Sequence, residues 1–238
     1  MKIALIGYGK MGKAIEEVAL QRGHTVGLII DLDNRHDFTR EKISNADVAI
    51  EFSSPESAPG NVMKCLEANL PVVCGSTGWL EKMGEIEKYC HAGNGAFLYS
   101  SNYSIGVNIF FEVNARLAEL MAKHPEYNVE LTEIHHTQKK DAPSGTAITL
   151  AEQILERVDR KTNWVNRTAE IPDELQILSK RRDPAPGTHK VKYTSPVDDL
   201  EIIHTAHNRK GFATGAVLAA EFILNKKGVF GMHDVLAF

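Results

Sequence analysis

The sequence predicts an α/β protein in which a doubly wound parallel sheet is followed by an α+β domain. Three observations indicate this fold. Short apolar runs alternate with amphipathic segments over about the first 100 residues, which is the pattern of βαβ units. A glycine-rich turn follows the first apolar run. After residue 103 the alternation stops, and a long helical segment precedes several strand-like ones.

The first half of the chain contains five predicted strands. Each is a short run of apolar residues, and the first ends in glycine. They are Lys2–Gly7, His24–Asp31, Asp47–Phe52, Leu70–Cys74 and Ala96–Tyr99. Helices are predicted over Gly12–Arg22, from Pro55 to Asn69, and over 80–91. We expect Ser54 to be the N-cap of the second helix, with Pro55 at its first position. Residues 32–46 are polar and are predicted to be irregular.

The second half has a different pattern, and we place a domain boundary near residue 103. A long helix is predicted over residues 104–123, and a helix capped by Ser144 runs to Val158. The predicted strands are Tyr127–His136, Thr188–Ser195 and Leu200–His207. A last apolar helix spans Gly211–Asn225. The pattern alone leaves open which domain this last helix joins.

Composition excludes several classes of protein. The net charge of −4 and the pI near 6.2 leave no basic excess to neutralise phosphates, so we expect no nucleic-acid partner. We find no secretory signal and no run of about 18 apolar residues, so we expect a cytoplasmic protein without a membrane partner. Cys65, Cys74 and Cys90 lack metal-binding spacing, and we expect mostly buried, reduced thiols.

The glycine-rich turn has the form G-x-G-x-x-G and lies between a predicted strand and a predicted helix. It consists of Gly7, Tyr8, Gly9, Lys10, Met11 and Gly12. This context is typical of a dinucleotide-binding loop, because the glycines let the backbone approach a pyrophosphate. Asp31 ends the second strand and is expected to bind a ribose 2′-hydroxyl, which favours NADH over NADPH. Lys10 and Arg35 could weaken that preference. An incidental turn is the alternative.

The other predicted strands also end in small or polar residues. In a doubly wound sheet, ligands bind outside the carboxyl ends of the strands. We therefore expect the cofactor to lie along Gly75, Ser76 and Thr77 and along Ser100, Ser101, Asn102 and Tyr103. Ser53 and Ser54 are weaker candidates. The alternative is ordinary turn chemistry, which uses the same residue types.

The segment from Glu133 to Ala147 gathers proton donors and cations. His135 and His136 lie at the end of a predicted strand, where successive side chains alternate faces, and Lys139 and Lys140 follow. Ser144 then begins a helix whose first N–H groups favour an anion. This chemistry predicts a receptor for a carboxylate, with a proton donor beside it. A metal site lacks a third ligand at close spacing. Structural histidines and solvated lysines are the simpler alternatives.

Four blocks in this order resemble dihydrodipicolinate reductase, the 4-hydroxy-tetrahydrodipicolinate reductase of lysine and diaminopimelate biosynthesis. The blocks are the glycine loop with Met11, Gly75–Gly78, Asn102–Asn108 and Glu133–Ala147. The last block, with its EIHHxxKxDAPSGTA pattern, is highly specific, whereas the glycine loop is shared with many other proteins. The resemblance spans nearly the whole chain.

The resemblance implies a cytoplasmic, NADH- or NADPH-dependent oxidoreductase acting on a small dicarboxylate. It implies a Rossmann-like domain over residues 1–103 and 210–238, and a substrate and oligomerisation domain with an open mixed sheet over 104–209. His135 and Lys139 match the catalytic positions, either of which would supply the proton. The substrate-binding positions match His136, Gly145 and Thr146. The family is usually a homotetramer assembled through the sheet of the second domain.

Two departures from the family pattern bear on the cofactor. Many relatives have an arginine directly after the acid of strand two, where this chain has Leu32. Residues 32–46 are also shorter than the matching segment of longer relatives. Two other functions remain open: a different two-domain nicotinamide dehydrogenase of amino-acid metabolism, and a non-catalytic dinucleotide sensor. Neither needs the block of His135, His136 and Lys139.

Overall fold

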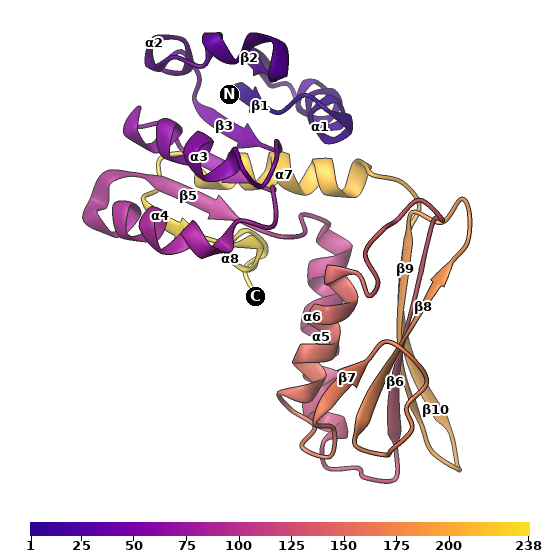
Figure 1. Cartoon of the computed structure of the whole chain (residues 1–238). Coiled ribbons are helices and arrows are strands. Elements are labelled where there is room, and N and C mark those ends of the chain that lie inside the picture. The colour runs from indigo at the N-terminus through magenta and orange to yellow at the C-terminus, as the bar shows by residue number, and fades with distance from the viewer. The chain divides into compact units, whose positions relative to one another are not determined.

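The computed structural model describes residues 1–93 and 95–238 and contains two compact units (Figure 1). Unit 1 combines Met1–Ile105 with Arg209–Phe238, and unit 2 is Gly106–Asn208. Unit 1 is therefore discontinuous in sequence, because the chain leaves it after residue 105 and returns to it at residue 209.

Unit 1 is built on a six-stranded sheet in which every neighbouring pair is parallel. Its strands are β1 (Lys2–Ile6), β2 (Thr25–Ile30), β3 (Val48–Glu51), β4 (Val72–Cys74), β5 (Ala96–Tyr99) and β11 (Gly228–Phe230). Their order across the sheet is β11-β5-β4-β3-β1-β2. The predicted doubly wound parallel sheet is confirmed. The three-residue strand β11 was not predicted, because it is too short to show periodicity.

Helices cover both faces of this sheet. One face packs against α1 (Lys10–Gln21), α7 (Lys210–Ile223) and α8 (Met232–Leu236). The other packs against α3 (Ala58–Glu67) and α4 (Met83–Tyr89). Alternation along the strands divides the core: Leu5 and Ile50 face the first set of helices, whereas Ala49 and Val72 face the second. Helix η2 (Leu80–Lys82) precedes α4, and η3 (Cys90–Asn94) follows it.

Two local predictions for unit 1 are wrong. Ser54 does not cap a helix; its carbonyl accepts hydrogen bonds from the N–H groups of Ser57 and Ala58, which closes a turn before α3. The proline that suits the first turn of α3 is Pro59, because a proline there costs no helical hydrogen bond. The segment 32–46 is not irregular either. It contains the 3₁₀ helix η1 (Leu32–Asp37) and the short helix α2 (Arg40–Ile43).

Unit 2 is a five-stranded mixed sheet with two helices on one face. Its elements are α5 (Ile105–Met121), β6 (Asn128–His135), α6 (Gly145–Leu155), β7 (Asn163–Val165), β8 (Glu174–Arg181), β9 (Gly187–Thr194) and β10 (Asp199–Ala206). The order is β10-β9-β6-β8-β7, and the central strand β6 is antiparallel to β9 but parallel to β8. The predicted open mixed sheet is confirmed. Apolar side chains of α5 and α6 pack onto β6, β8 and β9 to form the core.

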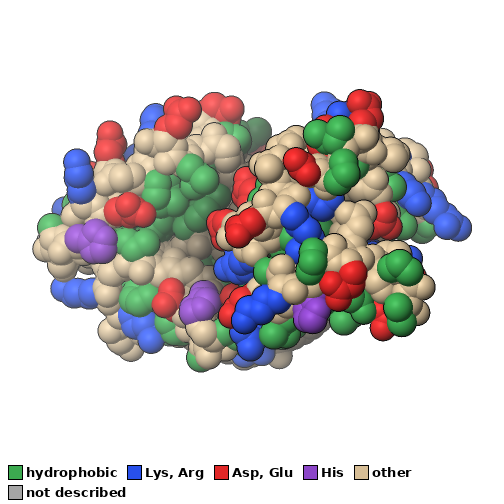
Figure 2. Space-filling view, turned by 90° about the horizontal axis from the view of Figure 1, so that it is seen from below, with side chains coloured by type: hydrophobic (Ala, Val, Ile, Leu, Met, Phe, Trp, Pro, Cys, Tyr) green, Lys and Arg blue, Asp and Glu red, His purple; other side chains and the backbone are tan. Residues whose placement is uncertain are grey.

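The cysteines match their prediction, and the drawn surface carries charges of both signs. Acidic and basic side chains are interspersed over the face drawn in Figure 2. Cys65, Cys74 and Cys90 are buried and free. Over the described part of the chain, every helix is too short or too polar to cross a membrane.

Candidate functional site

The glycine loop in unit 1 has the geometry of a dinucleotide cradle. Gly7 has a φ of +91°, and a Cβ there would lie 2.2 Å from the carbonyl oxygen of Phe52. A Cβ on Gly12 would lie 2.3 Å from the carbonyl oxygen of Gly7. A Cβ on Gly9 would meet nothing within 4 Å. The outer glycines therefore permit close backbone packing, whereas the middle one borders open space where a pyrophosphate fits.

The loop lies at the point where the strand order reverses. β2 pairs with one edge of β1 and β3 with the other, so the chain winds in opposite directions from β1. Ligands bind at such a switch point, outside the carboxyl ends of the strands. The close approach of Gly7, after β1, to Phe52, after β3, marks this position.

A cavity of about 340 Å³ adjoins the loop, and Asp31 lines it together with Arg35 and Lys64. Asp31 is exposed and is the N-cap of η1, where its carboxylate accepts a hydrogen bond of 2.9 Å from the N–H of Leu32. Glu56 lines it as well, so the cavity is bordered by two acids and two cations. Sequence reasoning found Asp31 and Arg35 but missed Lys64, which α3 supplies.

Some of the remaining residues expected to bind the cofactor lie at the strand ends, and others have side chains that point into the core. Gly75 lies under the Phe52 ring, because a Cβ there would be 2.1 Å from it. Ser100 donates a 2.7 Å hydrogen bond to the carbonyl of Asn102 and shapes that loop. Tyr103 is buried, and its hydroxyl donates to the carbonyl of Cys74 at 2.7 Å. Tyr103 is therefore part of the core of unit 1.

The other candidates in this group are also placed. Tyr8 is turned toward α1, where its hydroxyl donates to Glu16, and Lys10 is exposed at the start of that helix. Met11 packs against the core of unit 1. Ser76 is buried and Thr77 is exposed. Ser101 is exposed beside the loop of Asn102.

Glu51 is a buried acid beneath these loops that sequence reasoning did not single out. It ends β3 and is fully buried. Its Oε1 accepts a 3.0 Å hydrogen bond from the N–H of Ser53, and its Oε2 accepts one of 3.1 Å from the Cys74 thiol. Burial, together with the charge of Glu51, raises the pKa of Cys74. Glu51 thereby ties the end of β3 to the end of β4, and the thiol stays protonated.

The two adjacent histidines lie at the end of β6 in unit 2. The strand alternates buried and partly buried residues and ends at His135. His135 is 7% exposed and lies on the buried face with Glu133, two residues earlier, whereas His136 follows the strand and is half-buried. The strand ends between the two histidines, so the alternation expected of neighbouring strand residues does not set the direction of His136.

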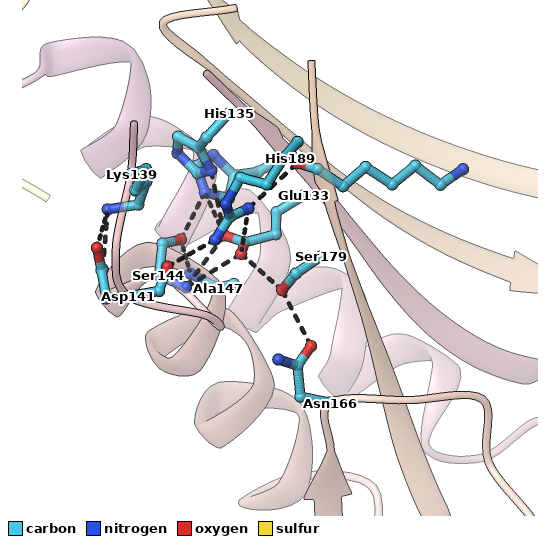
Figure 3. Close-up of polar contacts among 11 residues, drawn as sticks. Glu133, His135, Lys139, Asp141, Ser144, Ala147, Asn166, Ser179 and His189 are labelled. Carbon is cyan, nitrogen blue, oxygen red and sulfur yellow. Dashed lines mark hydrogen bonds and ion pairs between the residues drawn. The ribbon is translucent and has the colours of Figure 1, made fainter. Parts of the chain in front are cut away.

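Glu133 is the centre of a buried polar cluster on this face of the sheet (Figure 3). Its carboxylate is fully buried and accepts hydrogen bonds from the N–H of Ser144, at 3.2 and 3.1 Å, and from the hydroxyl of Ser179, at 2.7 Å. Oε2 lies 3.4 Å from His135 Nδ1 and 3.8 Å from His189 Nε2. Arg181 Nη1 lies 3.5 Å from Oε1.

The sheet register brings these residues together from distant parts of the chain. Glu133 on β6 is paired with Ser179 on β8 and with His189 on β9. His135 is paired with Arg181. Neighbouring residues on adjacent strands point to the same face, so one row across the sheet carries the hydroxyl, the carboxylate and the imidazole.

Burial sets the charge of the cluster. It lowers the pKa of His189 to about 3, assisted by the charge of His135, so His189 is neutral. The pKa of His135 is also lowered, first by burial and then by Lys139 and Arg181, although Glu133 opposes the shift. Burial alone would raise the pKa of Glu133, yet the hydrogen bonds from Ser144 and Ser179 hold it below its usual value. Glu133 is therefore an ionised carboxylate beside neutral imidazoles.

The predicted cations after β6 are not equivalent. Lys139 Nζ lies 2.8 Å from both carboxylate oxygens of Asp141, whereas Lys140 is exposed. Ser144 caps α6 as predicted, accepting from the N–H of Ala147 at 3.3 Å. Gly145 is exposed at the start of this helix, and a Cβ there would meet nothing within 4 Å. Thr146, next to it, is half-buried.

The fold brings together three potential metal ligands that sequence spacing could not show. No third ligand was close in sequence, but His189 supplies one from β9: single donor atoms of Glu133, His135 and His189 lie within 4.8 Å of one another. Both oxygens of Glu133 already accept hydrogen bonds. We therefore interpret the three residues as a buried polar cluster whose carboxylate is held by Ser144 and Ser179.

Sequence reasoning missed His189, Arg181 and Ser179. Local sequence has no signal for them, because they come from β8 and β9 and meet β6 only through strand pairing. Glu133 had a detectable signal: it lies two residues before His135 in a strand and must share its face. An acid at a position that alternation assigns to the core is unusual without a partner.

The comparisons with known proteins cover the whole chain. The protein-family model of the dihydrodipicolinate reductase N-terminus matches residues 1–103. The family model of the dihydrodipicolinate reductase C-terminus matches residues 106–236. A 4-hydroxy-tetrahydrodipicolinate reductase of Christiangramia forsetii is 48% identical over 238 residues, which is 100% of this chain and 98% of that protein. One of Thermosipho africanus is 36% identical over 240 residues, covering 99% and 98% of the two chains.

A solved structure has a similar fold. The dipicolinate-bound dihydrodipicolinate reductase of Paenisporosarcina sp. TG-14 superposes with a TM-score of 0.78 at 21% identity, over 98% of each chain. An amine dehydrogenase of Mycobacterium smegmatis superposes with a TM-score of 0.63 at 8% identity, over 98% of this chain and 95% of that one.

Proposed function

This chain belongs to the dihydrodipicolinate reductase family, and we propose that its His135 and Lys139 carry the proton chemistry of the reaction. The family membership makes it an NAD(P)H-dependent oxidoreductase of lysine and diaminopimelate biosynthesis, which reduces 4-hydroxy-tetrahydrodipicolinate to tetrahydrodipicolinate. The two other candidate functions are set aside, because curated reductases match over the full length of the chain. The placement of His135 beside a buried carboxylate is the observation that supports its role.

The proton can be delivered by a histidine that becomes charged when substrate binds. Free His135 is neutral, because burial lowers its pKa. A substrate with two carboxylates would place negative charge near the imidazole and raise that pKa again. Lys139 already faces an acid, Asp141, and can exchange it for a substrate carboxylate. Substrate binding would therefore favour the protonated form of His135, which is the form that can donate a proton in the reaction.

The dicarboxylate would be held after β6 and at the start of α6. His136 is half-buried behind the strand end, and Gly145 and Thr146 form the first turn of the helix. The start of an α-helix favours an anion, since its first N–H groups point outward. The exposure of Gly145 leaves room for a ligand to approach its backbone.

The cofactor would occupy the cradle in unit 1. Residues Gly7–Gly12, Gly75–Thr77 and Ser100–Tyr103 would contact it, and Asp31 would bind the ribose. When bound, NAD(P)H supplies the hydride. We propose a preference for NADH, because the Asp31 carboxylate would repel a 2′-phosphate. Arg35 and Lys64 line the same cavity, so NADPH would remain a usable cofactor.

We further propose that the protein is a cytoplasmic homotetramer assembled through the sheet of unit 2. β10 is an edge strand, and Ile203 on it is 56% exposed. An apolar side chain on an exposed edge favours association with another chain. Light scattering should give the mass of four copies of the 26.3 kDa chain. A monomer mass would contradict this assembly.

The test of function is the oxidation of NADH and NADPH, assayed side by side with the freshly generated condensation product of pyruvate and aspartate semialdehyde. Turnover favouring NADH is expected. Replacing His135 by Gln should lower kcat by about 100-fold and leave the Kd for NADH nearly unchanged, because the histidine lies outside the cofactor unit. His91→Gln, at an exposed position, is the control.

Each outcome of this test has a distinct meaning. Turnover favouring NADPH would keep the reaction and contradict the argument from Asp31. An equal loss of kcat and of NADH affinity in His135→Gln would contradict the role of His135. Cofactor binding without turnover of this substrate would contradict the assigned reaction for this chain.

A further inference from the structure

We propose that Glu133 is the positioning residue for His135: it receives the Nδ1–H of the imidazole, and thereby leaves Nε2 as the atom that exchanges the proton. The inference rests on the role proposed for His135. It concerns a residue that would touch neither substrate nor cofactor and would act through the histidine alone.

The first step is that Glu133 is a fixed anion. It is fully buried, and three hydrogen bonds from two residues hold its carboxylate. One of the donors, the N–H of Ser144, belongs to the N-cap of α6, so the start of that helix also stabilises the charge. A carboxylate with this number of donors stays ionised in spite of burial.

The second step is that the Glu133 oxygen with fewer hydrogen bonds is the one closest to His135. Oε1 accepts from both Ser144 and Ser179 and lies 3.5 Å from the guanidinium of Arg181. Oε2 accepts from Ser144 alone, and it lies 3.4 Å from His135 Nδ1 and 3.8 Å from His189 Nε2. The distance to His135 is long for a hydrogen bond, and contacts of this kind often tighten only when substrate binds. An anion facing Nδ1 favours the tautomer that carries its hydrogen there.

The third step is that a glycine borders the other ring nitrogen. Gly187 on β9 lies beside the imidazole, and a Cβ there would lie 3.1 Å from His135 Nε2 and 3.3 Å from Cδ2. Any larger residue would press on the edge of the ring that carries Nε2. Glu133 thus faces the Nδ1 side of the imidazole, whereas the residue beside Nε2 has no side chain.

The surrounding charges agree with this assignment. Arg181 on β8 and Lys139 after β6 oppose a charged imidazole, whereas Glu133 and Asp141 favour it. His189 on β9 meets the His135 ring edge-on with centroids 5.1 Å apart, and it is neutral. Its Nε2 lies 3.1 Å from the Ser144 hydroxyl. The N-terminus of α6 contributes the positive end of its helix dipole. Glu133 is therefore the one buried anion among the described groups that acts directly on His135.

The experiment uses nitrogen NMR of the full chain with ¹⁵N-labelled histidine. His135→Gln identifies the His135 signals by their loss. In the wild-type protein at pH 8, we expect the Nδ1–H tautomer. In Glu133→Gln, we expect mixed tautomers, a pKa of His135 lower by about 1 unit and a kcat lower by about 100-fold, with the KM for NADH unchanged.

Glu130→Gln is the matched control, because it makes the same change three residues earlier on β6, on the opposite face of the sheet. Its His135 signals and its kcat should equal those of the wild type. An Nε2–H tautomer in the wild-type protein would overturn the inference even if Glu133→Gln failed to fold. An unchanged tautomer and pKa in folded Glu133→Gln would also overturn it. Failure of the proposed function is separate: it would appear as full activity of His135→Gln.

Discussion

The burial of His189 predicts that unit 2 loses stability in acid. His189 is 5% exposed, and burial lowers its pKa to about 3. In the unfolded chain the imidazole titrates near its ordinary pKa of about 6.5. Below that pH the His189 imidazole binds a proton in the unfolded chain, whereas in the folded protein it stays neutral. The free energy of unfolding therefore falls as the pH drops from about 6.5 toward 3.

The size of the effect follows from these two pKa values. Between pH 7 and pH 4, the preference of the unfolded state for the proton grows to about 3 kcal/mol. That is a large share of the stability of an ordinary domain, which is about 5–15 kcal/mol. The lowered pKa of His135 acts in the same direction, so 3 kcal/mol represents His189 alone.

Urea unfolding at pH 7 and pH 4 measures this effect. Trp164 lies in unit 2 and Trp79 in unit 1, so a Trp79→Phe background lets fluorescence report unit 2 alone. At a fixed protein concentration, His189→Gln should lose about 3 kcal/mol less than the parent between the two pH values. His91→Gln should lose as much as the parent. Equal losses in His189→Gln and its parent would refute the reasoning.

Three further predictions concern close contacts and the cofactor. Gly187→Ala should lower kcat by about tenfold with the Kd for NADH unchanged, because its Cβ would press on His135; steady-state kinetics and NADH titration test this, and unchanged kcat would contradict it. Gly215→Ala should destabilise unit 1 by about 3 kcal/mol, because its Cβ would lie 1.7 Å from the Tyr103 carbonyl oxygen; urea unfolding followed at a unit 1 tryptophan tests this, and wild-type stability would contradict it. Asp31→Ala should lower the ratio of kcat/KM for NADH to that for NADPH, and an unchanged ratio would show that Asp31 does not discriminate.

The fold could be predicted where periodicity extends over several residues. Alternating apolar runs and the glycine turn were enough for the parallel sheet of unit 1, and the 3.6-residue pattern was enough for α5 and α7. The sequence could not show β8, since its apolar residues are only Leu175, Ile177 and Leu178 and a polar, charged end follows them. Ser54 misled because a serine before a proline suits both a helix cap and a turn, and only the observed hydrogen bonds separate the two.

The candidate site could be predicted only where its residues are close in sequence. The block from His135 to Thr146 carries its own chemistry and was found. Its support comes from His189, which is 54 positions beyond His135, and from strand register, which no local pattern encodes. Alternation did predict that Glu133 and His135 share a face. The ionised state of the Glu133 carboxylate depends on hydrogen bonds from Ser144 and Ser179, and only the tertiary structure brings these donors to it.

The discontinuity of unit 1 has a consequence for synthesis on the ribosome. The ribosome synthesises the chain from the N-terminus onward. All of unit 2 can therefore fold before the residues of α7 and β11 have been synthesised. Until residues 209–238 emerge, one face of the unit 1 sheet lacks the buried side chains of α7, and β5 is an unpaired edge. Synthesis of unit 1 therefore begins before that of unit 2 and ends after it. Loss of the final 30 residues would therefore leave unit 2 with its core complete, while unit 1 could not close its own.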